Sequence, residues 1–167
     1  ISQHADSMGA PSACEARNVP NVSYNGSTID SCPNTFLVSS RIDWEPYFEY
    51  IINCVAKGET IAADWTGTLA TGSVVLTDIN EAVAAKGTKE AVEAAKKELE
   101  AGTLKVFDTS KFTVNGETLT EFLADVDDMG DYVPETNAIS DGYFHESEYR
   151  SAPYFTIEID GITRLDK

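Results

Sequence analysis

Residues 43–58, DWEPYFEYIINCVAKG, carry the clearest helix signal in the chain. From Trp44 to Val55, apolar side chains recur at the spacing i, i+3, i+4, i+7, i+8 and i+11, which places them on one face of a helix. Asp43 stands where it can cap the first turn, and Gly58 is typical of a residue that ends a helix. The segment therefore predicts a helix that begins near Trp44 and stops before Gly58.

The sequence on both sides of this helix alternates between strand and helix patterns. Such an alternation is typical of an α/β domain with a largely parallel sheet and flanking helices. We therefore predict an α/β fold. The other expected elements are strands at residues 1–5, 19–24, 35–40, 73–76 and 104–107, and helices at residues 8–17 and 88–101.

The last third of the chain differs from the rest in charge. The formal net charge is −16, and residues 117–167 hold 13 acidic against 3 basic side chains. We therefore divide the chain into an α/β lobe, residues 1–116, and an acidic extension, residues 117–167, that packs on or beside it. Within the extension the sequence predicts a short helix at 119–126, a strand at 154–159 and a turn at Asp160-Gly161. Nucleic acid is excluded as a partner, because a protein that binds the phosphate backbone needs a cluster of Lys and Arg side chains on its surface.

The motifs of common enzymes and metal sites are incomplete here. The segment from Gly67 to Ser73 has the outline of a phosphate-binding loop but lacks its lysine. The run from Asp125 begins like a calcium loop, yet Thr136 stands where the bidentate glutamate is needed. His145 has nearby carboxylates but no second imidazole, so its segment is expected to be a solvated loop. The sequence therefore predicts a protein that is not an enzyme, with no catalytic residue, metal ligand or cofactor.

A candidate site follows from the expected topology. In open parallel sheets, ligands bind just beyond the carboxyl ends of the strands. Those ends deliver a carboxylate (Asp6), a ring and an amide (Tyr24 and Asn25), and Trp44 at the start of the long helix. This mixture suits a small, polar, ring-bearing ligand, with Trp44 as its stacking platform. The alternative is that Trp44 belongs to the core, because it also continues the apolar stripe of the helix.

Five segments follow one another over residues 1–110: HADS at 4–7, SYNGS at 23–27, IDWEPYF at 42–48, WTGTLATGSVVL at 65–76 and LEAGTLKVF at 99–107. Their order and spacing resemble those of the basic membrane protein family, the purine-nucleoside-receptor-like solute-binding lipoproteins of bacteria. Two residues depart from the family pattern at the expected site. Glu45 stands where a glycine is usual, and Thr71 stands where the family has an acidic residue.

The resemblance implies the C-terminal lobe of a type I periplasmic-binding fold. Its implied role is the extracytoplasmic solute-binding component of an ABC transporter, which hands a nucleoside to the permease. The implied location is the periplasm or the cell surface, with the membrane reached only through a lipid anchor outside this chain. An N-terminal lobe would be missing, so this chain alone is expected to bind nucleosides poorly. The alternatives are a nucleoside-acting hydrolase and a stand-alone acidic interaction domain.

The three cysteines allow two interpretations. If the helix from Trp44 packs back along the preceding strand, Cys54 returns to the level of Cys32, and an oxidising compartment would permit a disulfide between them. Cys14 would then remain free. The alternative is that all three are small buried residues with free thiols.

Overall fold

The computed structural model describes residues 1–126, 132–146, 148–150 and 154–165. It divides the chain into two compact units, residues 1–103 and residues 104–167. The division falls before the boundary at residue 116 that the charge pattern predicts. Among the described residues, no helix is both long and apolar enough to cross a bilayer.

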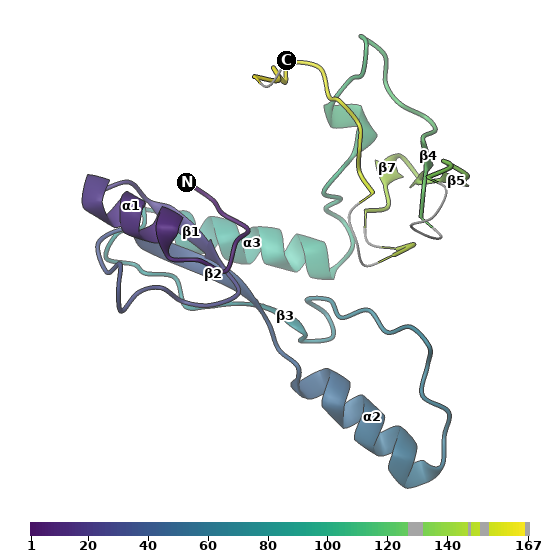
Figure 1. The fold of residues 1–167 in the computed structure, drawn as a ribbon, viewed down its shortest axis with the longest axis horizontal. Helices are drawn as coiled ribbons and strands as arrows, with labels where there is room; N and C mark the ends of the chain where they lie inside the picture. The colour runs from purple at the N-terminus through teal and green to yellow at the C-terminus, as the bar shows by residue number, and fades with distance from the viewer. Residues whose placement is uncertain (127–131, 147, 151–153, 166–167) are drawn as a thin grey trace. The chain divides into compact units, whose positions relative to one another are not determined.

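The first unit is built on a three-stranded sheet (Figure 1). The strands lie in the order β1 (Asn21–Tyr24), β2 (Phe36–Ile42) and β3 (Val74–Leu76). β1 runs parallel to β2, and Ser2 forms a further parallel bridge to Val22. β3 runs antiparallel to β2. The strands predicted at residues 19–24, 35–40 and 73–76 are thus confirmed, whereas residues 1–5 form only the bridge at Ser2. The sheet is mixed rather than largely parallel.

The path of the chain after β2 explains the direction of β3. Val74 lies opposite Ile42, so the chain returns to the end of β2 that it left. α2 (Glu45–Lys57) carries the chain away, and Gly58 ends it in the left-handed conformation with φ of 69°. Residues 58–73 then run back beside α2, where the Ala62 N–H donates to the Tyr50 hydroxyl at 2.8 Å. A parallel β3 would have required a return to Phe36 at the opposite end of β2.

The apolar stripe of α2 is divided between two environments. The predicted helix is confirmed, and Asp43 Oδ1 accepts from the Glu45 N–H at 3.1 Å. Tyr47 and Tyr50 face the returning segment and are half-buried. The other half of the stripe stays open to solvent in this unit, with exposed fractions of 56% for Trp44 and Phe48, 65% for Ile52 and 68% for Val55. The interpretation of Trp44 as a core residue is therefore wrong.

Two more helices complete the first unit. α1 (Gly9–Arg17) packs beside β1, and α3 (Thr88–Glu100) follows β3 in the chain. Both match predicted helices. No residue of α3 is buried, so α3 is an amphipathic helix that the unit covers only in part.

All three cysteines are free and buried. The predicted bridge between Cys32 and Cys54 assumed that α2 packs back along β2, and the exposed side chains of α2 show that it does not. Cys32 lies instead near Glu15 and Cys14 of α1. Burial, together with these two groups, raises the pKa of the Cys32 thiol.

The second unit has a core of its own. It contains η1 (Thr109–Lys111), the pair β4 (Leu123–Ala124) and β5 (Thr136–Asn137), and the hairpin β6 (Ile139–Ser140) and β7 (Tyr143–Phe144). Phe144 is fully buried, and Phe155 stacks on Phe107 with ring centroids 4.2 Å apart. Residues 117–167 are therefore not merely an acidic extension, because most of this apolar cluster comes from them.

Several local predictions in this unit are wrong. Residues 119–126 contain the strand β4 rather than a helix, because their apolar side chains join a cluster of short strands. Residues 104–107 and 154–159 form no strand.

The predicted turn at Asp160-Gly161 is present, with Gly161 at φ of 88°. The Asp160 carboxylate accepts from the Thr113 hydroxyl at 2.6 Å and from the Gly116 N–H at 2.8 Å, and these bonds lower its pKa.

Glu15 of α1 holds the segment that precedes β2. Its carboxylate accepts from the Thr35 hydroxyl at 2.7 Å and from the Asn34 side-chain amide at 2.6 Å. The hydrogen bond from Thr35 is the largest cause that lowers the Glu15 pKa. Because Thr35 is buried, its hydroxyl depends on this carboxylate for an acceptor.

We predict that Glu15→Gln lowers the melting temperature at neutral pH, because a neutral amide accepts these bonds less strongly than a carboxylate. A folded-state pKa below the unfolded value adds stability above roughly pH 5 that is lost as the pH falls through the glutamate range near pH 4 and below. The deficit of the variant should therefore shrink on acidification. Thermal melts from pH 3 to 7 test this, with the exposed Glu49→Gln as the control. A deficit independent of pH would contradict the role of the charge.

Candidate functional site

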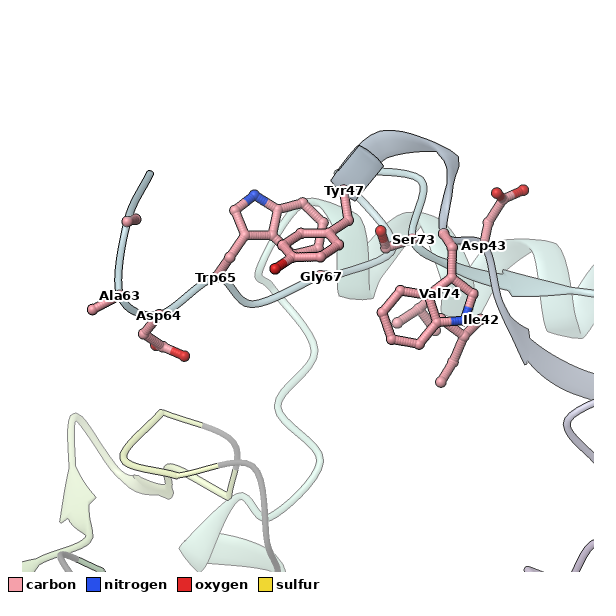
Figure 2. Close-up of a pocket in the computed structure, with 11 residues that line it drawn as sticks. Ile42, Asp43, Tyr47, Ala63, Asp64, Trp65, Gly67, Ser73 and Val74 are labelled. Carbon is pink, nitrogen blue, oxygen red and sulfur yellow. The ribbon is translucent and has the colours of Figure 1, made fainter. Parts of the chain in front are cut away.

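A cavity of about 410 Å³ lies beside the first turn of α2, within the first unit (Figure 2). We call it the tryptophan pocket, because it is lined by Trp44 and Trp65, the chain's two tryptophans. The end of β2, the start of α2, the returning segment and the start of β3 all contribute to it. The residues around it are Ile42, Asp43, Trp44, Tyr47, Ala62, Ala63, Asp64, Trp65, Gly67, Ser73 and Val74.

Aromatic rings form one wall of the tryptophan pocket. The ring centroids of Tyr47 and Trp65 lie 5.2 Å apart, and those of Trp44 and Tyr47 lie 6.1 Å apart. Figure 2 shows the rings of Tyr47 and Trp65 against each other. Tyr50 stacks on Trp65 from further along the helix, at 6.4 Å. Trp65 is thus fixed by two helix residues, whereas Trp44 is more than half exposed and offers ring surface to a ligand.

Gly67 and Ser73 make a close contact at the pocket. A Cβ atom on Gly67 would lie 2.5 Å from the Ser73 Cβ and 3.0 Å from the Trp65 ring, so this position accepts only glycine as the backbone stands. Ser73 is buried, and its hydroxyl has no hydrogen-bond partner in the described part of the chain. A buried hydroxyl without a partner costs about 1–3 kcal/mol.

Two carboxylates line the pocket, and they differ in their partners. Asp43 accepts from the Glu45 N–H and lies 3.4 Å from the Arg41 guanidinium. Asp64 is exposed and makes no hydrogen bond or ion pair with the described residues. The lining contains no lysine, arginine or histidine. The pocket is therefore aromatic and acidic.

The residues predicted from strand ends fall into separate places. Trp44 lines the tryptophan pocket. Asp6, Tyr24 and Asn25 line a different hollow of about 210 Å³, where the Tyr24 ring stacks on His4 at 4.2 Å. Glu45 is the first residue of α2 and does not line either space. Their common contact with one ligand stays a prediction.

Thr71 has a local structural role in the returning segment. Its hydroxyl accepts from the Thr68 N–H at 2.8 Å and donates to the Thr68 carbonyl at 3.0 Å. It lines neither the tryptophan pocket nor the smaller hollow. These bonds shape the turn between Gly67 and Ser73, so Thr71 supports the contact that those two residues make.

Sequence reasoning missed most of the tryptophan pocket. Tyr47 was assigned to the apolar stripe of a helix, and Asp64 lies in a stretch with no regular pattern. Trp65, Gly67 and Ser73 lie in one of the five quoted segments, so that segment did contain the signal. The strand-end argument could not find them, because they enter the site from the long connection between α2 and β3.

A second polar cluster lies on the β6–β7 hairpin of the other unit. Ser140 Oγ is 2.7 Å from His145 Nε2, and His145 Nδ1 is hydrogen-bonded to the Glu148 carboxylate. The His145 side chain is only 9% exposed and its ring stacks on Tyr143. The expectation of a solvated loop is therefore wrong for His145. Among the described residues, no group of three or more His, Cys, Asp or Glu side chains could hold a metal ion.

No family model matches the chain, and no curated protein is significantly similar to it.

We predict that Gly67→Ala destabilises the first unit by about 1–3 kcal/mol, because the added methyl overlaps the Ser73 side chain. It should also shift the fluorescence of Trp65, which the same methyl approaches. Gly26→Ala is the matched control, because a Cβ there meets nothing within 4 Å. Denaturant titrations and tryptophan emission spectra check both effects. Equal stability of the two variants would mean that Gly67 and Ser73 do not lie in contact.

Proposed function

We propose that this chain is the ligand-holding, extracytoplasmic component of an ABC transporter and that it binds a small, polar, ring-bearing molecule, a nucleoside, in the tryptophan pocket. The observation that supports this best is the convergence of both tryptophans on one cavity of about 410 Å³. A volume in the range of about 300–1,000 Å³ suits a small molecule. The five family-like segments support the choice of a nucleoside.

The chemistry of the pocket suits a base and its sugar. Trp44 offers a face on which a flat ring can stack, since more than half of its surface is exposed. Asp64 can accept hydrogen bonds from ring amines or from sugar hydroxyls, because its carboxylate is not engaged by the described residues. A few polar groups around an apolar wall are enough to orient a ligand.

The rest of the proposal follows the resemblance. The mixed sheet with helices would belong to one lobe of a type I periplasmic-binding fold, and the permease would be its protein partner. The membrane would be reached through a lipid anchor outside this chain. A second lobe would complete the site, so binding by this chain alone is expected to be weak. Sub-micromolar affinity of the chain for a nucleoside would contradict that part of the proposal.

We predict that Trp44→Ala lowers nucleoside affinity about tenfold or more, in line with the ~1–3 kcal/mol that one stacked base contributes. The melting temperature should change little, because Trp44 is 56% exposed. Titration of adenosine, guanosine and inosine tests this, with the two tryptophan indole N–H signals in NMR as the readout. Ile52→Ala is the control, since Ile52 is 65% exposed on the same helix but does not line the pocket. Equal affinities for the two variants would place the ligand elsewhere.

One observation favours a second candidate function, hydrolysis. Ser140, His145 and Glu148 are joined in the order of a nucleophile, a general base and the residue that orients it. With Nδ1 donating to Glu148, His145 Nε2 can take the Ser140 proton as Oγ attacks an ester carbonyl. The proton then passes to the leaving alcohol, and water releases the acyl group. Binding remains the primary proposal, because both tryptophans line one cavity of a size that suits a small molecule.

Turnover of p-nitrophenyl acetate tests the second candidate. If Ser140 is the nucleophile, the chain hydrolyses the ester above the buffer rate, and Ser140→Ala reduces the rate to background. Ser110→Ala is the matched control, since Ser110 is another hydroxyl of this unit and, among the residues that the structure describes, bonds only to Asp108. Hydrolysis that is equal in both variants, or absent from the unmodified chain, would remove this candidate.

A further inference from the structure

We propose that the tryptophan pocket selects a positively charged ring over a neutral one. The inference rests on the proposed binding function and adds to it the charge of the ligand. The preferred ligands are therefore nucleosides whose ring carries a fixed or protonated cationic nitrogen, such as N-alkylated nucleosides.

The aromatic wall of the pocket is the first observation that favours a positively charged ring. A cation is attracted to the face of tryptophan or tyrosine within about 6 Å of the ring centroid. Trp44, Tyr47 and Trp65 supply three such rings, and neighbouring centroids lie 5.2 to 6.1 Å apart. A charged ring on Trp44 would gain both stacking and this electrostatic attraction. A neutral ring of the same size would gain the stacking alone.

The charges around the pocket also favour a cationic ligand. Asp43 and Asp64 line it, and no basic residue does. Asp43 already faces Arg41, so Asp64 is the carboxylate left to balance a cation. A neutral ligand would partly desolvate Asp64 without neutralising it, which is unfavourable. A cationic ligand would neutralise the carboxylate in the same step.

The net charge of the first unit also favours a cationic ligand, before the ligand touches the pocket. Residues 1–103 carry 14 acidic and 7 basic side chains, so the unit as a whole is negative. A net negative field raises the local concentration of cations and speeds their approach. Because salt screens exposed charges over about 8–10 Å, the preference should weaken as ionic strength rises.

The test compares two isomers that differ in charge. 1-Methyladenosine is cationic at neutral pH, whereas N6-methyladenosine carries the same methyl group and is neutral. We expect the cationic isomer to bind about tenfold more tightly, as the attraction to the rings and to Asp64 implies. Titrations followed by tryptophan fluorescence and by the two indole N–H signals give both affinities for the same chain.

Variants separate the charge of Asp64 from that of the unit. Asp64→Asn should reduce the ratio of the two affinities about threefold or more, and Asp78→Asn, an exposed acid outside the pocket, should leave the ratio unchanged. Equal affinities for the two isomers would overturn the cation preference and leave the binding proposal intact. Loss of binding for both isomers would overturn both proposals. A ratio reduced equally by both variants would show that the field of the unit, not Asp64, sets the preference, and would also overturn the inference for this pocket.

Discussion

The contact of Trp65 with Tyr47 and Tyr50 is the interaction on which the first unit depends. It holds the connection after Gly58 against α2, so that the chain comes back to the end of β2 that it left. The same contact sets the direction of β3 and forms one wall of the tryptophan pocket. Fold and site therefore share one cause, because the segment that closes the sheet also forms the aromatic wall.

Local elements of the first unit could be predicted from the sequence because their signals are local. The apolar spacing from Trp44, with Gly58 after it, is enough to define α2, and alternating short runs define the three strands. The direction of β3 could not be predicted, because it depends on a connection without regular hydrophobic period. The core of the second unit could not be predicted for a related reason. Its aromatic core is assembled from Phe107, Phe144 and Phe155, which lie far apart in the sequence among acidic residues.

The candidate site, like the fold, could be predicted only where the sequence signal is local. Trp44 was found because it stands at the start of a predictable helix, and its exposure agrees with a place at a ligand surface rather than in the core. Asp64 and Trp65 could not be assigned, because no periodicity tells which side of an irregular segment faces a cavity. Strand-end reasoning instead joined Trp44 to Tyr24 and Asn25, which line a different hollow. The expected topology placed these residues in one group, whereas in the structure they line two different hollows.

The tight approach of Gly67 and Ser73 has a consequence for how this sequence can vary over evolution. Since a Cβ at residue 67 would overlap the one at residue 73, any larger side chain at the first position requires a glycine at the second or a shifted backbone. The two positions should therefore covary in descendants of a common ancestor, with at most one of them carrying a side chain. A lineage with a side chain at residue 67 would also have to move the Trp65 ring, which lies 3.0 Å from that Cβ, so the aromatic wall of the pocket would change together with the turn.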